Sequence, residues 1–232
     1  AYIPGHDHVC IADNKERAEY LHRRIHLIHS HWPEVVRART VPNREVRRLS
    51  FAHGGKMRVL SGESGAVGIG QSPDSFHGSE LPYWRNAGHQ FSMIYPSMIN
   101  RDHSKILLES TPAPMTENST EWWRDQCRDA KQGLGRWVYA FFPFWDGKLN
   151  QRRWPKNSAL DNEEIGMMNR YGPEGLKKEH LAFRRLMLET DAEIRRNPDL
   201  FKVYYPLDDI SCWIATAGSV FRTDVLKKHQ EA

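Results

Sequence analysis

A short apolar run that leads directly into a helical pattern constrains the fold of this chain most strongly. The run from His8 to Ala12 is typical of a buried strand. Asp13 is placed to cap a following helix, with Glu16 completing a capping box. Apolar residues then recur on one helical face, at Ala18, Leu21, Ile25 and Ile28. Pro33 ends the pattern. Because a strand followed at once by a helix is the building unit of a parallel sheet, we expect an α/β fold.

A hairpin and two further strands are predicted downstream. Leu49 and Phe51 are separated from Met57 and Val59 by a glycine-containing turn, which predicts the hairpin. The two further strands lie in the short runs 75–84 and 105–112, each of which has a polar tip.

The polar residues after these two strands are of the types that a nucleotide-hydrolysing sheet needs. Glu80 follows the first strand, and Ser110 and Thr111 lie near the tip of the second. Pro112 ends the second strand because proline offers no N–H group to a ladder. A carboxylate at one strand end can orient the attacking water, while hydroxyls on the next strand respond to the γ-phosphate.

The order and spacing of these groups resemble the large terminase subunit of tailed bacteriophages. In that family, Ser79 and Glu80 correspond to the end of the Walker B strand and its catalytic glutamate. The sequence Glu109-Ser110-Thr111 corresponds to the coupling motif.

Three later segments also look similar to parts of that family. They are an aromatic strand at 137–145, a helix at 176–185, and the segment 199–206, which closes at 218–221 and precedes the nuclease domain. The resemblance therefore covers nearly the whole chain, more specifically after Leu49.

The resemblance implies a P-loop-NTPase-like (ASCE) fold with a mostly parallel sheet flanked by helices, plus a small, mainly helical subdomain. Residues 1–145 would belong to the motor ATPase core, and residues 146–232 to a second ATPase subdomain that leads toward a nuclease domain. We interpret 147–175 as linker-like. After it we expect one apolar helical stripe, formed by Leu176, Phe183, Met187 and Ile194, that ends at Asn197-Pro198.

No Gly-x-x-x-x-Gly-Lys-Ser/Thr phosphate loop occurs in the 232 residues. The resemblance places this Walker A segment upstream and an RNase H-like nuclease domain downstream. We therefore interpret the chain as an internal piece of a terminase, and expect it to hydrolyse ATP no faster than background by itself.

The resemblance also implies cofactors and partners. ATP and Mg²⁺ would be the cofactors of the complete motor, bound weakly or not at all by this piece alone. Ser79 takes the place of the usual Walker B aspartate, and its hydroxyl can hold a Mg²⁺-bound water without contributing charge. The partners would be double-stranded DNA, the small terminase subunit and the portal, in a ring oligomer in the host cytoplasm.

Charge and composition agree with such a role. The net charge is +4 and the sequence pI is about 9.0, which is compatible with a polyanionic partner. The densest basic run holds five arginines between positions 37 and 48 and predicts contact with DNA phosphates: Arg37, Arg39, Arg44, Arg47 and Arg48. A solvated charged face is the alternative interpretation of this run.

The cysteines and the hydropathy pattern give no sign of a secreted or membrane protein. Cys10, Cys127 and Cys212 are odd in number and widely spaced, which favours a reducing compartment. No apolar run approaches membrane-spanning length.

Two other functions stay open from the sequence. A metal-dependent nuclease could gather acids from strand ends, at Asp13, Asp74, Glu80 and Glu109. A non-catalytic terminase-like binding module is the other alternative. For Glu109 we also consider a structural ion pair with Arg85 or Arg101.

Overall fold

The computed structural model describes residues 4–42, 45, 47–65, 72–99, 103–114 and 119–213. Arg44, Arg101 and the segment 218–221 lie outside the described residues. The chain forms two compact units: the first comprises residues 1–110 and 117–126, and the second comprises 111–116 and 127–232. The functional division predicted at residue 145 stays a prediction.

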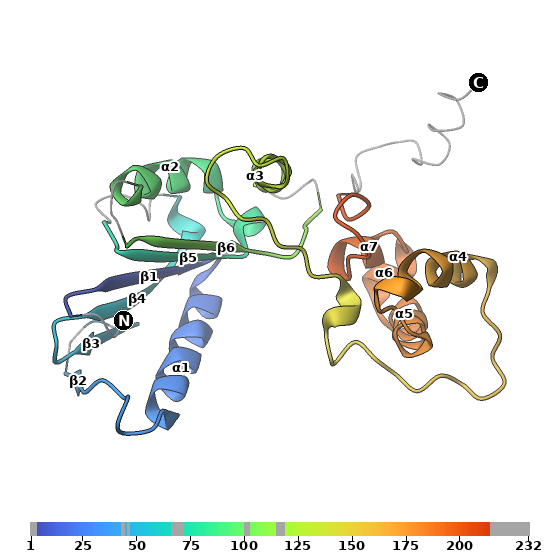
Figure 1. Cartoon of the computed structure of the whole chain (residues 1–232), viewed down its shortest axis with the longest axis horizontal. Helices are drawn as coiled ribbons and strands as arrows, with labels where there is room; N and C mark the ends of the chain where they lie inside the picture. Colours follow the sequence, from blue (N-terminus) through green and yellow to red (C-terminus); the bar gives the residue numbers. More distant parts are fainter. Residues whose placement is uncertain are drawn as a thin grey trace. The chain divides into compact units, whose positions relative to one another are not determined.

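A six-stranded sheet in the order β2-β3-β4-β1-β5-β6 forms the first unit (Figure 1). Its strands are β1 (Asp7–Ala12), β2 (Thr40–Val41), β3 (Arg48–Phe51), β4 (Lys56–Ser61), β5 (Ser75–Ser79) and β6 (Lys105–Glu109). Neighbouring strands among β4, β1, β5 and β6 are parallel, whereas β2–β3 and β3–β4 pair antiparallel. The predicted hairpin and the predicted α/β class with a mostly parallel sheet are confirmed.

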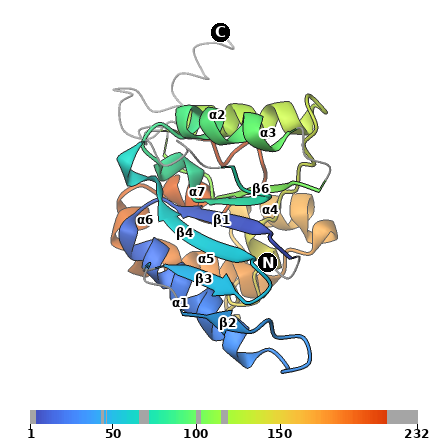
Figure 2. The ribbon, with the colours of Figure 1, turned by 90° about the vertical axis from the view of Figure 1, so that its left-hand side faces the viewer.

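Helices cover both faces of this sheet. Helix α1 (Lys15–His31) lies on one face, while α2 (Ala87–Met98) and the start of α3 (Thr120–Lys131) lie on the other, as Figures 1 and 2 show. Phe76 of β5 packs against Phe91 of α2 with a ring-centroid distance of 6.3 Å. Phe91 in turn contacts Trp122 of α3 at 5.8 Å. Two short 3₁₀ helices, η1 (Gly62–Ser64) and η2 (Leu81–Tyr83), follow β4 and β5.

Helix α1 departs from the sequence prediction at both ends. Asn14, rather than Asp13, caps it, because the Asn14 side chain accepts a hydrogen bond from the Arg17 backbone N–H at 2.9 Å. Ala18 is buried as expected, but Ile28 is 56% exposed. A helix of 17 residues is ~25 Å long, whereas the six-residue strands β1 and β4 span ~20 Å, so the last turns have less sheet to cover.

Helices form the second unit. They are α4 (Asn162–Tyr171), α5 (Lys178–Thr190), α6 (Ala192–Arg196) and α7 (Leu200–Tyr204), with the 3₁₀ helices η3 (Phe144–Asp146) and η4 (Gly172–Glu174). One hydrophobic cluster holds them together, and its buried members include Phe144, Trp145, Leu181, Ile194 and Phe201. Within the described ranges, no helix has the length and apolar composition needed to cross a membrane.

Three sequence predictions for this unit were wrong. The aromatic segment 137–145 is not a strand, since residues 137–143 are irregular and η3 follows. The linker-like segment 147–175 contains α4, which begins with a capping box between Asp161 and Glu164. The stripe from Leu176 to Ile194 is divided between α5 and α6, because Asp191 leaves the helical conformation and caps α6.

Candidate functional site

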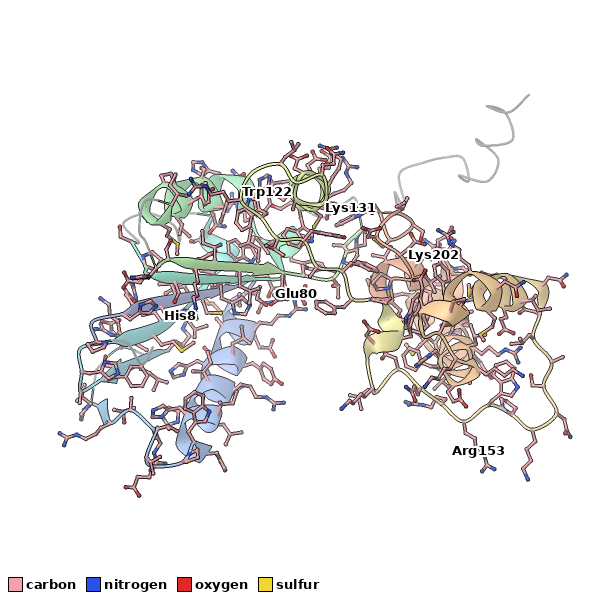
Figure 3. All side chains as sticks on the ribbon, in the orientation of Figure 1. His8, Glu80, Trp122, Lys131, Arg153 and Lys202 are labelled. Atoms are coloured by element: carbon pink, nitrogen blue, oxygen red, sulfur yellow. The ribbon has the colours of Figure 1, made fainter. Side chains whose placement is uncertain are left out.

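The predicted site residues lie where the parallel strands end. Asp13 directly follows β1, and Ser110 directly follows β6. Ser79 is the last residue of β5, and Glu80 comes next. Carboxyl ends of adjacent parallel strands meet at one edge of a sheet, which is where α/β proteins commonly bind ligands. Ser110 Oγ donates a hydrogen bond to Glu80 Oε2 at 2.9 Å. The structure therefore brings together the two groups that the sequence analysis paired, and Figure 3 shows Glu80 at this edge.

The backbone of Glu80 has an unusual conformation. Its φ and ψ are 59° and 47°, in the left-handed region, which costs a non-glycine residue of order 1–2 kcal/mol. The Glu80 N–H donates to the Glu109 carbonyl at 2.9 Å and extends the ladder from β6 past the end of β5. The strand direction changes at Glu80 itself, so its side chain leaves the alternation of β5.

A buried tryptophan fixes the turn that follows Glu80. Trp84 is fully buried, and its Nε1 donates to the Ser79 carbonyl at 2.8 Å. Its ring packs so closely on Gly62 that a Cβ at Gly62 would lie 3.0 Å from Trp84 Cγ. Phe76 contacts the same ring edge-to-face at 6.5 Å. The conformation of the Glu80 turn therefore depends on the packing of Trp84 in the core beneath α2.

An arginine and a second carboxylate complete the surroundings of Glu80. Arg17 Nη1 lies 3.3 Å from Asp13 Oδ2 and 3.9 Å from Glu80 Oε1. Asp13 is 9% exposed, and its Oδ1 is buried with no hydrogen-bond partner among the described residues. The Arg17 guanidinium also lies over the Tyr83 ring, 5.9 Å from the centroid. Arg17 is thus shared between two carboxylates at the ends of adjacent strands.

These contacts act on the protonation of Glu80 in opposite directions. Burial raises the pKa of Glu80 above its ordinary value, and the nearby Glu109 and Asp13 carboxylates raise it further. The hydrogen bond from Ser110 and the charge of Arg17 hold the pKa down, but the net shift is upward. A carboxylate with a raised pKa is a stronger base than an exposed one.

Glu109 lies opposite Ser79 in the β5–β6 register and contacts His77. His77 Nε2 is 3.2 Å from Glu109 Oε1, and a hydrogen bond from Ser79 also reaches the Glu109 carboxylate. Hydrogen bonds to Cys10 Sγ and to Glu109 raise the pKa of His77 to about 10. Although burial opposes the shift, the hydrogen bonds from His77 and Ser79 lower the pKa of Glu109. The structural ion pair considered for Glu109 therefore forms with His77 rather than with Arg85.

The remaining predicted residues are placed as follows. Thr111 is exposed and directly follows Ser110. Arg37 and Arg39 are exposed after α1, and Arg37 donates to the Ser30 carbonyl. Arg47 has a positive φ of 67°, and Arg48 pairs with Glu45. The predicted DNA contact of this basic run stays a prediction.

The four acids of the nuclease alternative do not meet at one end of the sheet. Asp74 precedes β5 at its amino end, where its Oδ2 accepts from the Asp7 N–H at 2.8 Å. Asp13, Glu80 and Glu109 lie at the opposite, carboxyl end. In the part of the chain that the structure describes, no group of three or more His, Cys, Asp or Glu side chains is arranged to hold a metal ion. The structure therefore does not bring together the four acids that the nuclease alternative needs.

Sequence reasoning missed Arg17 and His77 as members of this site. Arg17 lies one helical turn after Asp13, a spacing that predicts an ion pair between them but not the contact with Glu80. His77 lies on the same strand face as Ser79, and strand alternation could have placed both residues beside Glu109 once the register was known.

The architecture has a solved counterpart. The large terminase of bacteriophage HK97 aligns with 97% of this chain at a TM-score of 0.56 and 14% sequence identity. The fold is similar to that of part of a phage large terminase. The alignment covers 43% of the HK97 terminase chain, so this chain spans less than half the length of that terminase. The large terminase ATPase domain of Thermus phage P74-26 aligns with 88% of this chain and 76% of its own, at 14% identity and a TM-score of 0.49. No family model matches the chain, and no curated protein sequence matches it.

Proposed function

We propose that this chain is the water-orienting and phosphate-sensing part of the ATPase motor of a phage large terminase, which couples ATP hydrolysis to the packaging of viral DNA. The observation that carries this proposal is the hydrogen bond from Ser110 to Glu80. It joins the carboxylate after one parallel strand to the first hydroxyl after the next, in a fold that is similar to a large terminase.

Glu80 is the residue that would act on the attacking water. Its carboxylate accepts a hydrogen bond from that water and orients it toward the γ-phosphate. The raised pKa of Glu80 suits a group that accepts a proton as the water attacks, because a stronger base binds the proton more tightly.

Ser110 is the residue that would report on the phosphate. Its hydroxyl donates to Glu80 from the end of β6, so a displacement of this strand end would reorient the Glu80 carboxylate. With Thr111, it would couple hydrolysis to movement of the motor.

The residues at this edge fit an indirect contact with Mg²⁺. Ser79 donates its hydroxyl hydrogen to Glu109, which leaves the oxygen lone pairs free to accept from a Mg²⁺-bound water. Most ligands of the ion would come from ATP and from a phosphate loop, and the bound ion would neutralise charge on the transferring phosphoryl group. Within the described part of the chain, the side chains alone would hold the ion and ATP weakly.

The proposed partners follow from the same role. Double-stranded DNA, a phosphate-loop segment, a nuclease domain, the small terminase subunit and a portal ring would complete the motor in the host cytoplasm. Duplex phosphates would contact the basic run, in which Arg37 and Arg39 are exposed.

Complementation of ATP hydrolysis tests this function. The 232-residue chain alone is expected to hydrolyse ATP at background rate, because its sequence contains no Gly-x-x-x-x-Gly-Lys-Ser/Thr loop to hold the β- and γ-phosphates. A phosphate-loop segment of a large terminase, mixed with the chain or fused to its amino end, should restore hydrolysis. Steady hydrolysis by the chain alone would show that another group binds the phosphates. DNA binding without hydrolysis in the complemented protein would favour a non-catalytic binding module.

A further inference from the structure

The segment between η3 and α4 concentrates positive charge. Residues 147–160, which we call the basic loop, contain no acidic residue and four cations: Lys148, Arg152, Arg153 and Lys156. The loop belongs to the second unit and follows a long irregular path, drawn in yellow to orange in Figure 1. The arginine run at 37–48 belongs to the first unit.

The backbone of the basic loop is tied down at several points. Near its start, Asn150 Nδ2 donates to the Phe144 carbonyl at 2.7 Å, and the Arg152 N–H donates to the Glu179 carbonyl at 2.9 Å. Near its end, Arg185 of α5 donates to the Ala159 carbonyl at 2.8 Å. These contacts hold the backbone that carries the cations, so a ligand would bind with less loss of backbone conformational entropy than in a free loop.

The cations of the basic loop face solvent. Lys148, Arg153 and Lys156 are exposed, and Figure 3 shows Arg153 pointing away from the helices. In the described part of the chain, these three side chains take part in no ion pair. Arg184 and Arg185 behave differently, because Glu163 and Glu164 neutralise them at 2.7 and 2.5 Å. The positive charge of the loop is therefore available to a partner.

The aromatic side chain of the loop is occupied within the fold. Trp154 packs against the hydrophobic cluster of the second unit, and the Arg185 guanidinium lies over its ring at 4.5 Å. A single-stranded nucleic acid would need exposed aromatic rings for base stacking. A protein partner would use aromatic anchors at the centre of the interface, where lysine is depleted. A tethered row of lysine and arginine side chains without a free ring fits duplex phosphates instead, which carry one charge per ~1.7 Å of helix axis.

We propose that the basic loop contacts the phosphate backbone of double-stranded DNA, without sequence preference, as a second DNA surface of the motor proposed above. This inference rests on the proposed function for the identity of the polyanion. It places the contact on Lys148, Arg153 and Lys156.

DNA binding by charge-neutralised variants tests the proposed contact between the basic loop and duplex DNA. The triple variant Lys148→Gln/Arg153→Gln/Lys156→Gln is compared with Lys178→Gln/Arg195→Gln/Arg196→Gln, which removes the same charge from exposed positions of the same unit. Fluorescence anisotropy with a labelled 30-base-pair duplex is measured between 50 and 200 mM salt. The slope of log affinity against log salt should fall by about 0.9 for each phosphate that the loop no longer neutralises, and affinity at 50 mM salt should fall roughly tenfold or more in the loop variant only.

The outcomes separate this inference from the proposed hydrolysis. Equal slopes and affinities for the two triple variants would overturn the loop contact, as would a wild-type chain that does not bind the duplex at 50 mM salt. A loop-dependent preference for oligo-dT, or for polyglutamate, over the duplex would also overturn it. Duplex binding is measured without ATP, so it does not depend on hydrolysis at Glu80. A failure of the loop prediction therefore leaves the role of Glu80 standing, and a failure of Glu80 in hydrolysis leaves the loop contact standing.

Discussion

Ser110 and Glu80 are joined by a hydrogen bond of 2.9 Å, although they are 30 positions apart in the sequence. The bond links the ends of β6 and β5, and its geometry depends on the left-handed turn at Glu80 and on the burial of Trp84. A single interaction therefore couples the position of one strand end to the orientation and protonation of the carboxylate at the next. This coupling is what a phosphate-sensing site requires.

Removal of the Ser110 hydroxyl should raise the pKa of Glu80. The hydrogen bond from the hydroxyl stabilises the ionised carboxylate and so lowers the pKa of Glu80. In Ser110→Ala this lowering is lost, while burial and the neighbouring acids still raise the pKa. A ¹³C NMR titration of labelled glutamate carboxyl groups in the isolated chain measures this. Ser92→Ala is the matched control, because Ser92 Oγ donates to the His89 carbonyl on the exposed side of α2. A Glu80 titration that stays at its wild-type midpoint in Ser110→Ala would contradict the coupling.

Removal of the Arg17 charge should also raise the pKa of Glu80, but by less than Ser110→Ala does. Arg17 is 51% exposed, so salt screens its attraction for the carboxylate. The difference between Arg17→Gln and the wild type should therefore shrink between 50 mM and 0.5 M salt, whereas the effect of Ser110→Ala should persist. Arg23→Gln, on the exposed face of the same helix, is the control. An Arg17 effect that does not depend on salt would indicate a rearrangement of the turn.

The pairing of His77 should make stability depend on pH. The folded-state pKa of about 10 exceeds the ordinary value of 6.5, so the stabilisation is complete below about pH 6.5 and is lost as the pH rises toward 10. Urea unfolding at pH 6 and pH 9.5 should show a larger loss of stability for His77→Gln at pH 6. His89→Gln, an exposed change on α2, should show no such trend. An equal loss for His77→Gln at both pH values would show that His77 is not held in its charged form.

A buried ion pair should dominate the stability of the helical unit. Glu164 is fully buried, and Arg185 holds its carboxylate through Nε at 2.6 Å and Nη2 at 2.5 Å. Loss of the arginine leaves the buried Glu164 carboxylate uncompensated, so Arg185→Gln should cost about 3–5 kcal/mol of unfolding free energy. Glu163→Gln should cost much less, because Glu163 is 56% exposed. Urea unfolding followed by circular dichroism compares the two, and similar costs would contradict this assignment.

Local patterns predicted the elements whose formation depends on neighbouring residues. The hairpin of β3 and β4, strand β1 and most of α1 follow from alternation, helical spacing and turn residues. Helix α4 was missed because Gly166 and the prolines around it weaken the helical pattern. Asp161 and Glu164 have the spacing of a capping box and could have indicated its start.

The candidate site was predictable only in part. Glu80 and Ser110 were paired because each directly follows a strand, and the parallel register brings such positions together. The contact of Arg17 with Glu80 and that of His77 with Glu109 join residues from different elements. Their positions depend on the strand order and on the angle at which α1 leaves the sheet, and no local spacing encodes these.

The rate of ATP hydrolysis after replacement of Glu80 tests the central claim most directly. In the chain complemented with a phosphate-loop segment, Glu80→Gln keeps the shape of the side chain and removes the base. It should lower the single-turnover rate by about 10²–10⁴-fold while ATP affinity stays within a few-fold of the wild type. Glu189→Gln, an exposed change on α5, should leave both quantities unchanged. A Glu80→Gln protein that hydrolyses bound ATP at the wild-type rate would contradict the account.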